Sequence, residues 1–254
     1  GTSGELVDHG DGTYTYTFDL DITAVTSPMA VSYEPTLTHR VGMQFSGGVS
    51  LNPTYDWVPA TNETTGIEKR EVVTVESCNS CHNPLRMHGG GRFDTKLCVM
   101  CHNPGTTEPN SLTSQDFKVL VHKIHAGRQL PSVEAGGQYL IYGYRDSVHD
   151  YSKVGYPGDL NNCAKCHVGS TTSDDPVIGT ITSHGDNWAN VPTAEACGSC
   201  HDDVDFSLHA GGQADNSDCV SCHSAGGIAG SIEAAHLHEE LIASETIKIE
   251  VQSI

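Results

Sequence analysis

Apolar and polar residues alternate near the start of the chain, as they do in a β-strand with one buried face. In residues 13–22 the apolar set shares one face: Tyr14, Tyr16, Phe18, Leu20 and Ile22. Asp11-Gly12 just before this run favours a turn. The alternation returns in a second set: Val41, Met43 and Phe45. We expect one more strand at residues 71–75, so residues 1–72 predict part of a small antiparallel sheet or barrel domain.

The apolar period changes to that of a helix in two later segments. Residues 113–127 carry an apolar stripe at helical spacing: Phe117, Leu120, Val121 and Ile124. Thr113 and Asp116 predict a capping box at its start, and Gly127 is a typical C-terminal stop. Residues 231–241 predict a second helix after the last cysteine.

The end of the chain returns to the strand pattern, with alternating apolar residues at Ile247, Ile249 and Val251. Residues 241–254 therefore predict a β-strand that returns to the first sheet or starts a next domain. Between the two β regions, residues 73–240 predict a domain of short helices and loops.

All ten cysteines fall into five copies of the pattern Cys-x-x-Cys-His, numbered below as motifs 1 to 5 in chain order. The motifs are Cys78-Asn-Ser-Cys81-His82, Cys98-Val-Met-Cys101-His102, Cys163-Ala-Lys-Cys166-His167, Cys197-Gly-Ser-Cys200-His201 and Cys219-Val-Ser-Cys222-His223. In this pattern both thiols bond to a haem as thioethers, and the histidine becomes the proximal ligand of the iron. The chain thus predicts five covalently bound haem c groups.

Zinc, disulfides and a thioredoxin-like redox site are the alternatives for such cysteines. The gaps from Cys81 to Cys98 and from Cys200 to Cys219 suit a four-cysteine zinc ribbon, but a ribbon leaves Cys163 and Cys166 without partners. A ribbon also does not require a histidine after the second cysteine. With 15 histidines in the chain, five of five by chance has odds on the order of one in a million for the motif. A redox motif needs one Cys-x-x-Cys in a βαβ setting, not five.

Ten further histidines are candidates for the second axial ligands, and this excess over the four methionines favours bis-histidine ligation. Two internal repeats place a histidine before glycines and ten residues before the next motif: His88 before Cys98 and His209 before Cys219. Glycines let backbone pass close to a flat macrocycle.

Two helical segments supply the remaining distal ligands. His122 and His125 are neighbours on one helix face, close enough to serve two different haems but too divergent to ligate one iron from both sides. In residues 231–241 we favour His236 over His238. The predicted distal set is His88, His122, His125, His209 and His236. His149 and His184 are reserves, and His9 and His39 are expected to be structural.

The net charge of −19 argues against nucleic-acid and anionic-membrane partners. No run of 18 apolar residues is present, so we expect no transmembrane segment. Since haem c is attached after export in bacteria and no signal peptide precedes Gly1, we expect a mature or partial form of an exported protein.

The sequence also resembles the outer-membrane decahaem c-type cytochrome family of the MtrC and OmcA type. The resemblance covers nearly the whole chain and rests on long strings: Asp11-Gly-Thr-Tyr-Thr-Tyr16, Tyr33-Glu-Pro-Thr-Leu-Thr-His-Arg40, Glu76-Ser-Cys-Asn-Ser-Cys-His82, Met87-His-Gly-Gly90, Cys101-His-Asn-Pro-Gly-Thr106, Asp116-Phe-Lys118, His122-Lys-Ile-His125 and Ala196-Cys-Gly-Ser-Cys-His-Asp-Asp203.

The family alternates split β-barrel domains with pentahaem domains. The resemblance implies a mixed fold with little regular secondary structure, in which a small antiparallel, split-barrel-like β region precedes a haem-packed pentahaem domain of short helices and loops. This sequence resembles the late part of the first barrel, one pentahaem domain and the first strand of the next barrel, and it lacks the second half and a lipid-anchor leader.

We expect an electron-transfer protein that passes electrons to metal oxides, flavins, humics or partner cytochromes. The family implies a place on the extracellular face of the outer membrane, or secretion, with the periplasm as the fallback, and partnership with a porin–cytochrome conduit. Non-specific outer-sphere reduction of Fe(III) or Mn(IV) could accompany it. Two alternatives remain: a multihaem reductase with one open haem, and a filament subunit that assembles through exposed strands.

Overall fold

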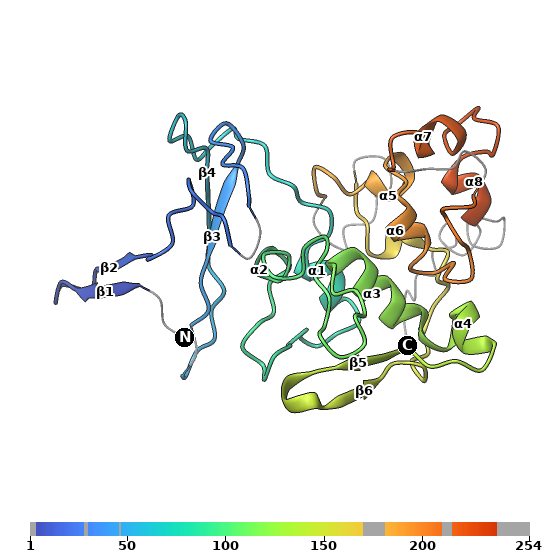
Figure 1. Cartoon of the computed structure of the whole chain (residues 1–254), viewed down its shortest axis with the longest axis horizontal. Helices are drawn as coiled ribbons and strands as arrows, with labels where there is room; N and C mark the ends of the chain where they lie inside the picture. Colours follow the sequence, from blue (N-terminus) through green and yellow to red (C-terminus); the bar gives the residue numbers. More distant parts are fainter. Residues whose placement is uncertain (1–3, 28–29, 46, 170–180, 210–214, 238–254) are drawn as a thin grey trace, which may run out of the picture. The chain divides into compact units, whose positions relative to one another are not determined.

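The computed structural model describes the chain except for residues 1–3, 28–29, 46, 170–180, 210–214 and 238–254 (Figure 1). Its backbone groups into two compact units. We call residues 1–41 and 55–69 the N-terminal unit, and residues 42–54 and 70–254 the motif unit. The boundary predicted at residue 72 and the strand predicted in 241–254 stay predictions, and the latter lies outside the described residues.

Short strands form the N-terminal unit and its junction with residues 42–54. Strands β1 (Glu5–Asp8) and β2 (Tyr14–Thr17) pair antiparallel, and β3 (His39–Gly42) pairs with β4 (Thr54–Trp57). The predicted turn lies between β1 and β2, where the Asp11 carboxylate accepts from the backbone N–H of Thr13 at 2.9 Å. Arg40 and Asp56 join β3 to β4 through a two-point ion pair at 2.6 and 3.0 Å.

Two strand predictions need correction. The strand expected over residues 13–22 ends at Thr17, and the Asp21 carboxylate closes a local turn with Thr23 instead. The strand expected at 71–75 is wrong: the Glu71 carbonyl accepts from the His184 N–H, the Glu71 N–H donates to His184 Nδ1, and Val75 starts a helix. An alternating pattern cannot form a strand where no neighbouring strand supplies a ladder of hydrogen bonds.

The motif unit consists of short helices separated by loops (Figure 1). Its α-helices are α1 (Val75–Asn79), α2 (Thr95–Cys98), α3 (Phe117–Ala126), α4 (Pro131–Glu134), α5 (Asn187–Asn190), α6 (Ala194–Cys197), α7 (Cys219–Cys222) and α8 (Ile232–His236). Three 3₁₀ turns are η1 (Gly127–Gln129), η2 (Tyr144–Asp146) and η3 (Cys163–Lys165), and the hairpin strands are β5 (Leu140–Tyr142) and β6 (Val148–Asp150).

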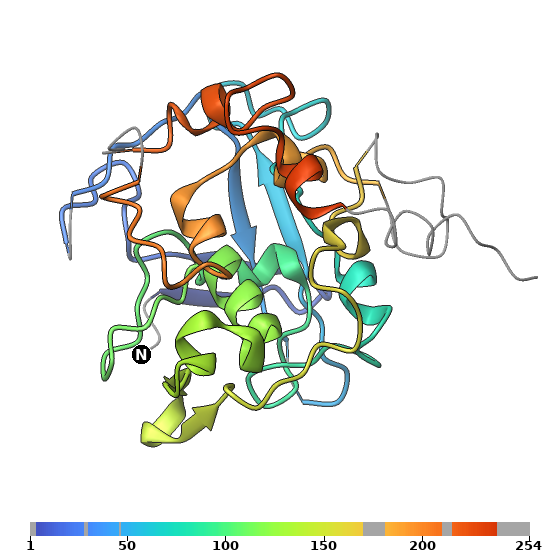
Figure 2. The same ribbon diagram turned by 90° about the vertical axis from the view of Figure 1, so that its right-hand side faces the viewer.

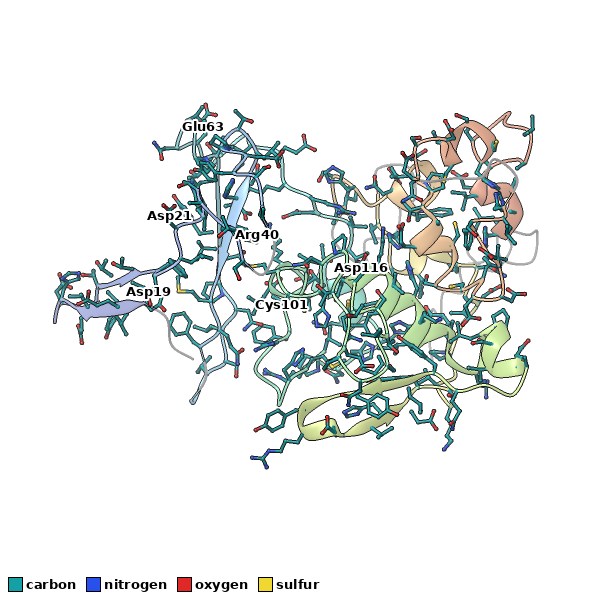
Figure 3. The ribbon with its side chains drawn as sticks, viewed as in Figure 1. Asp19, Asp21, Arg40, Glu63, Cys101 and Asp116 are labelled. Atoms are coloured by element: carbon teal, nitrogen blue, oxygen red, sulfur yellow. The ribbon has the colours of Figure 1, made fainter. Side chains whose placement is uncertain are left out.

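The longest of these helices, α3, starts later than the sequence predicts. Thr113 does not cap it, because Ser114 pairs with Thr107 in an isolated β-bridge. Asp116 is the cap and accepts from the N–H of Lys118 at 3.2 Å (Figure 3). Gly127 ends the helix at a φ of +48°, as predicted. The helix predicted over 231–241 is observed as α8, capped by Ser231, and residues 238–241 lie outside the described part.

The aliphatic core is small. Ala126, Leu130, Tyr139 and Ile141 are buried together where α3 meets the β5–β6 hairpin. Figures 1 and 2 show α3 within the motif unit beside α6. Short helices, short antiparallel sheets and long loops agree with the predicted fold class. Among the described helices, none has the length and apolar character to cross a membrane.

Candidate haem-binding sites

Each of the five motifs folds as one helical turn. In every motif the backbone N–H of the histidine donates to the carbonyl of the first cysteine, at 2.9 to 3.0 Å. Local caps support several of these turns: Asp94 caps α2 and Thr193 caps α6. The turn carries both thiols and the histidine on one short element, as thioether attachment requires. All ten cysteines are described, and none of them is paired in a disulfide.

Every motif histidine lies opposite one further histidine. The distances between ring centroids are 6.1 Å for His82–His125, 5.9 Å for His88–His102, 6.1 Å for His122–His167, 6.2 Å for His201–His236 and 6.0 Å for His209–His223. A metal held between two imidazoles, with bonds of about 2.0 Å to each nitrogen, separates the ring centres by about 6 Å. The spacing therefore fits an iron between each pair.

The five partners are the five distal ligands predicted from the sequence. The structure adds the pairing, which the sequence left open, and it assigns each predicted distal histidine to a single motif. Their role as ligands stays a prediction. His238 lies outside the described residues, so the choice between His236 and His238 is not made by a direct comparison.

Hydrogen bonds fix the ring orientation of three of these histidines. The Nδ1 atoms of His102, His125 and His236 lie 2.8 to 2.9 Å from the carbonyls of Gln115, Val121 and Ile232. A carbonyl only accepts, so each Nδ1 must carry the proton. Nε2 is then left with a lone pair for a metal, the arrangement usual for metal-bound histidine.

Burial keeps other rings of the set neutral. Burial, and secondarily the nearby His122, lowers the pKa of His167 to about 4. Burial also lowers the pKa of His122, whose Nδ1 has no hydrogen-bond partner among the described residues. The pKa of His88 is lowered by burial and then by the charge of Arg92. A neutral imidazole is the form that binds iron.

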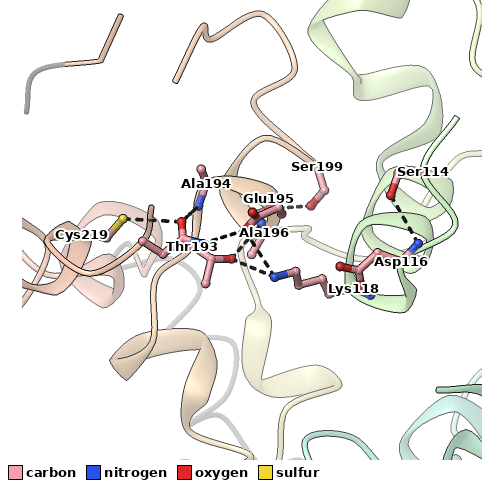
Figure 4. Close-up of polar contacts among 10 residues, drawn as sticks. Ser114, Asp116, Lys118, Thr193, Ala194, Glu195, Ala196, Ser199 and Cys219 are labelled. Atoms are coloured by element: carbon pink, nitrogen blue, oxygen red, sulfur yellow. Dashed lines mark hydrogen bonds and ion pairs between the residues drawn. The ribbon is translucent and has the colours of Figure 1, made fainter. Parts of the chain in front are cut away.

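Helix α3 carries two histidines that face the histidines of two different motifs. His125 faces His82 of motif 1, whereas His122 faces His167 of motif 3. This matches the expectation that the two neighbouring histidines reach different irons. Lys118 ties the same helix to α6, with Nζ 3.5 Å from Thr193 Oγ1 and 3.4 Å from Glu195 Oε2 (Figure 4).

A second ion pair connects α3 to motif 4. Lys123 Nζ lies 2.9 Å from the Asp202 carboxylate, which also accepts from the N–H and hydroxyl of Ser132. Burial raises the pKa of Asp202, but hydrogen bonds from Ser132 and Lys123 lower it below its usual value. Lys123 follows His122 and Asp202 follows His201, so the pair joins positions next to two different candidate ligands. Sequence reasoning missed this pair, although an acid directly after motif 4 was visible.

The histidine of the first repeat lies in a strained loop. His88 has a φ of +51°, and Gly89 and Gly90 after it are also left-handed, at +73° and +88°. Non-glycine residues seldom adopt this conformation. Met87 and Arg92 close the loop through paired backbone hydrogen bonds. The glycines predicted to bring backbone close to a haem thus also allow the turn itself.

The reserve histidines make other contacts. His149 Nε2 lies 3.1 Å from the hydroxyl of Ser147, and His184 Nδ1 lies 2.9 Å from that of Ser183. His39 Nε2 bonds to the Glu34 carbonyl, and His9 to Thr15. The structural role expected of His9 and His39, and the place of His149 and His184 as reserve ligands, stay predictions.

The thiols of different motifs influence one another and so reveal which motifs are neighbours. Burial raises the pKa of Cys78 to about 11, with further contributions from Cys166 and Cys98. After burial, the largest such influence on Cys163 is Cys200, and on Cys197 it is Cys219. The motifs therefore lie in the order 2, 1, 3, 4, 5, which differs from their order in the chain. No spacing in the sequence gives this order.

The zinc alternative finds no support here. Within the described residues, which include every cysteine, no group of three or more histidine, cysteine, aspartate or glutamate side chains is arranged to hold a metal ion. A structural zinc site needs four such ligands around one point.

Comparisons with known proteins agree with this geometry. Residues 70–239 match the family model "Outer membrane cytochrome MtrC/MtrF-like, domains II/IV", and residues 2–64 match the model "OmcA-like N-terminal domain". The multiheme cytochrome MtrC of Shewanella baltica (strain OS185) is 30% identical over 231 residues, which are 87% of this chain and 29% of that protein.

Two solved structures are also similar. The outer membrane decaheme cytochrome OmcA superposes with a TM-score of 0.75 at 34% identity, over 91% of this chain and 33% of that one. MtrC from Shewanella baltica OS185 gives a TM-score of 0.55 at 29% identity, over 87% and 31%. The chain thus spans about a third of the length of these relatives.

Proposed function

The chain belongs to the outer membrane cytochrome MtrC/MtrF-like family, and on this premise we propose that it is a pentahaem electron-transfer module with five bis-histidine haems. The observation that carries the proposal is the one-to-one pairing of five motif histidines with five others at ring distances of 5.9 to 6.2 Å. Chance contacts between rings would not give every motif one partner.

The residues that would hold each haem follow from the motifs and the pairs. Each cysteine pair would supply two thioether bonds, and the motif histidine and its partner would both serve as ligands of the iron. The sites are motif 1 with His125, motif 2 with His88, motif 3 with His122, motif 4 with His236 and motif 5 with His209.

Haem iron, when bound, supplies reversible one-electron oxidation and reduction. The chain's own residues determine how that chemistry can be used. Two imidazoles on each iron would leave no open position for a substrate, which favours electron transfer over the reductase alternative. Motif 1 lies near motifs 2 and 3, motif 3 near motif 4, and motif 4 near motif 5. This supports the inference that electrons pass between neighbouring centres.

The cellular role is proposed by analogy with the relatives. Their printed names describe outer membrane decahaem and multihaem cytochromes. We propose an extracellular position for this chain, with metal oxides, flavins or humics as acceptors and partner cytochromes or a porin–cytochrome conduit as donors. The net charge of −19 suits an exposed, soluble surface.

Intact mass and spectroscopy test the proposal together. Five covalent haems add about 3 kDa to the 27.0 kDa chain. The ferric protein should give only low-spin haem signals, and it should not bind carbon monoxide once reduced. A lower mass increment would contradict five haems. A high-spin signal in the intact protein would instead favour a reductase with one open iron.

A further inference from the structure

Residues 42–54 form a hairpin that packs against motif 2. The backbone N–H of Met43 donates to the Pro53 carbonyl at 2.9 Å, and Phe45 and Leu51 exchange two hydrogen bonds. At the base of this hairpin, a Cβ added to Gly42 would lie only 2.5 Å from Met100 Sδ, inside motif 2. A methyl group at this point would require the Met100 side chain to shift.

One buried side chain attaches the hairpin to the loop of the candidate ligand His88. Asn52 is 6% exposed, and its Nδ2 donates to the Gly91 carbonyl at 2.9 Å. Its Oδ1 accepts from the N–H of Phe93 at 2.8 Å and of Asp94 at 3.3 Å. Nδ2 also donates to the Leu51 carbonyl, so the amide uses both donors and both acceptor positions.

These contacts span the segment that separates the two candidate ligands of motif 2. Gly91 ends the His88 loop, while Asp94 caps α2, the helix that carries Cys98. A second contact holds the same loop, because Arg92 Nε donates to Gln44 Oε1 at 2.8 Å. Asn52 therefore fixes the position of His88 relative to Cys98 and His102.

The strain at His88 explains why such a support is needed. A histidine at a φ of +51° is held only where its surroundings over-determine the backbone. The loop's own closure, between Met87 and Arg92, spans four residues that include three consecutive left-handed ones. The contacts from Asn52 and Gln44 come from outside the loop and oppose its relaxation.

We propose that Asn52 is a positioning residue for the distal ligand His88 and that hairpin 42–54 clamps the second haem site. This inference rests on the proposed bis-histidine ligation of motif 2. Asn52 does not touch the iron site itself. It acts by holding the loop that presents His88 at 5.9 Å from the ring of His102.

The test compares spin state in the complete five-haem protein. In Asn52→Leu, Gly91, Phe93 and Asp94 lose their side-chain partner, and we expect part of one haem in five to become high-spin in the ferric state. Reduced protein should then bind up to one equivalent of carbon monoxide, against none in the parent. Added imidazole should restore the low-spin spectrum. A merely structural role would lower stability without this single-site signature.

A double variant and a matched control locate the effect. In a His88→Ala background, Asn52→Leu should add no further high-spin signal, because the same site is already open. Asn110→Ala removes an amide that bonds to Asp146 at 3.0 Å elsewhere in the motif unit, and it should leave every haem low-spin. Gln44→Ala alters an exposed contact to the same loop and should give a smaller high-spin fraction than Asn52→Leu.

The outcomes separate this proposal from the one on which it rests. If Asn52→Leu retains five haems and stays fully low-spin, the clamp is wrong while bis-histidine ligation stands. Should Asn52→Leu fail to assemble, a Gln44→Ala protein without any spectral change overturns the clamp. A parent protein with fewer than five haems, or with an open haem, overturns the proposed function instead.

Discussion

Two stretches of the motif unit repeat the same order of candidate ligands but support them differently. Each has a motif histidine, a loop histidine, a second motif histidine and a helix histidine: His82, His88, His102 and His125 in the first repeat, and His201, His209, His223 and His236 in the second. In both repeats the loop histidine pairs with the second motif and the helix histidine with the first motif. Motif 3 and His122 stand outside this scheme.

The helix ligands of the two repeats are held alike. Nδ1 of His125 bonds to the carbonyl four residues earlier, and His236 does the same at the same distance of 2.8 Å. The loop ligands are not. His88 depends on the clamp from hairpin 42–54, whereas His209 stacks on Phe206 at 6.0 Å with an interplanar angle of 20°. The repeat therefore encodes which histidines are candidate ligands, and contacts with distant parts of the chain determine how the loop histidines are held.

Removing the helix ligands should have the largest effect and should treat both repeats equally. His125→Ala and His236→Ala each delete one axial ligand, so each should leave one haem in five high-spin and able to bind one equivalent of carbon monoxide. Magnetic circular dichroism of the ferric protein measures this directly. His149→Ala is the matched control and should change nothing. Unequal results would break the equivalence of the two repeats.

Charge next to the motif histidine is the second difference between the repeats. Asn83 follows His82, but the charged Asp202 follows His201 and pairs with Lys123. Lys123→Met leaves a negative charge, which stabilises ferric iron and should lower the potential of the motif 4 haem. Asp202→Asn should raise it. At about 10 Å and an effective dielectric of about 20, one charge contributes about 1.7 kcal/mol, or roughly 70 mV.

Potentiometric titration followed by the visible spectrum measures these shifts. The comparison variant is Asn83→Asp. It places a carboxylate directly after His82, as Asp202 lies directly after His201, but among the described contacts no lysine pairs with position 83. It should lower the potential of the motif 1 haem. Shifts of the same sign in Lys123→Met and Asp202→Asn would show that the pair acts through structure and not through charge.

A substitution in the left-handed loop of the first repeat should have a smaller effect than the changes above, and this effect should be on stability. Gly89 has a φ of +73°, which L side chains rarely adopt, so Gly89→Ala adds backbone strain. We expect a loss of about 1 kcal/mol in the free energy of unfolding, measured by denaturant titration of the haem-loaded protein. Gly158→Ala, whose nearest neighbour would lie 3.4 Å away at an ordinary φ, is the control. If Gly89→Ala left the free energy of unfolding unchanged, the loop would not be strained.

Loss of the stacking between Phe206 and His209 in the second repeat should have the smallest effect on the spectra. Phe206→Leu keeps an apolar side chain but removes the flat ring beside His209, which should allow small rotations of the imidazole. We expect broadened low-spin electron paramagnetic resonance signals of one haem, with no high-spin fraction. A substantial high-spin signal would mean that Phe206 supports His209 as firmly as the clamp supports His88.

Much of the candidate site could be read from the sequence because covalent chemistry fixes its spacing. The motifs, the loop histidines and the Gly127 stop of α3 depend on residues close together in the chain, whereas the N-terminal cap of α3 was misplaced. The contact of Asn52 with Gly91 joins positions 39 residues apart, and that of Lys123 with Asp202 joins positions 79 apart. No local pattern announces such contacts. The strand expected at residues 71–75 failed for the same reason, since a strand requires a partner elsewhere.

The three-residue separation of His122 and His125 on α3 fixes the distance and the angle between their side chains. On one α-helix it corresponds to a rise of about 4.5 Å and a turn of about 60° between the two side chains. Any substitution, insertion or bend that shifts one imidazole shifts the other with it. Backbone geometry therefore sets the separation of the candidate ligands for motifs 1 and 3, and a change in this part of α3 during evolution must be tolerated at both proposed centres.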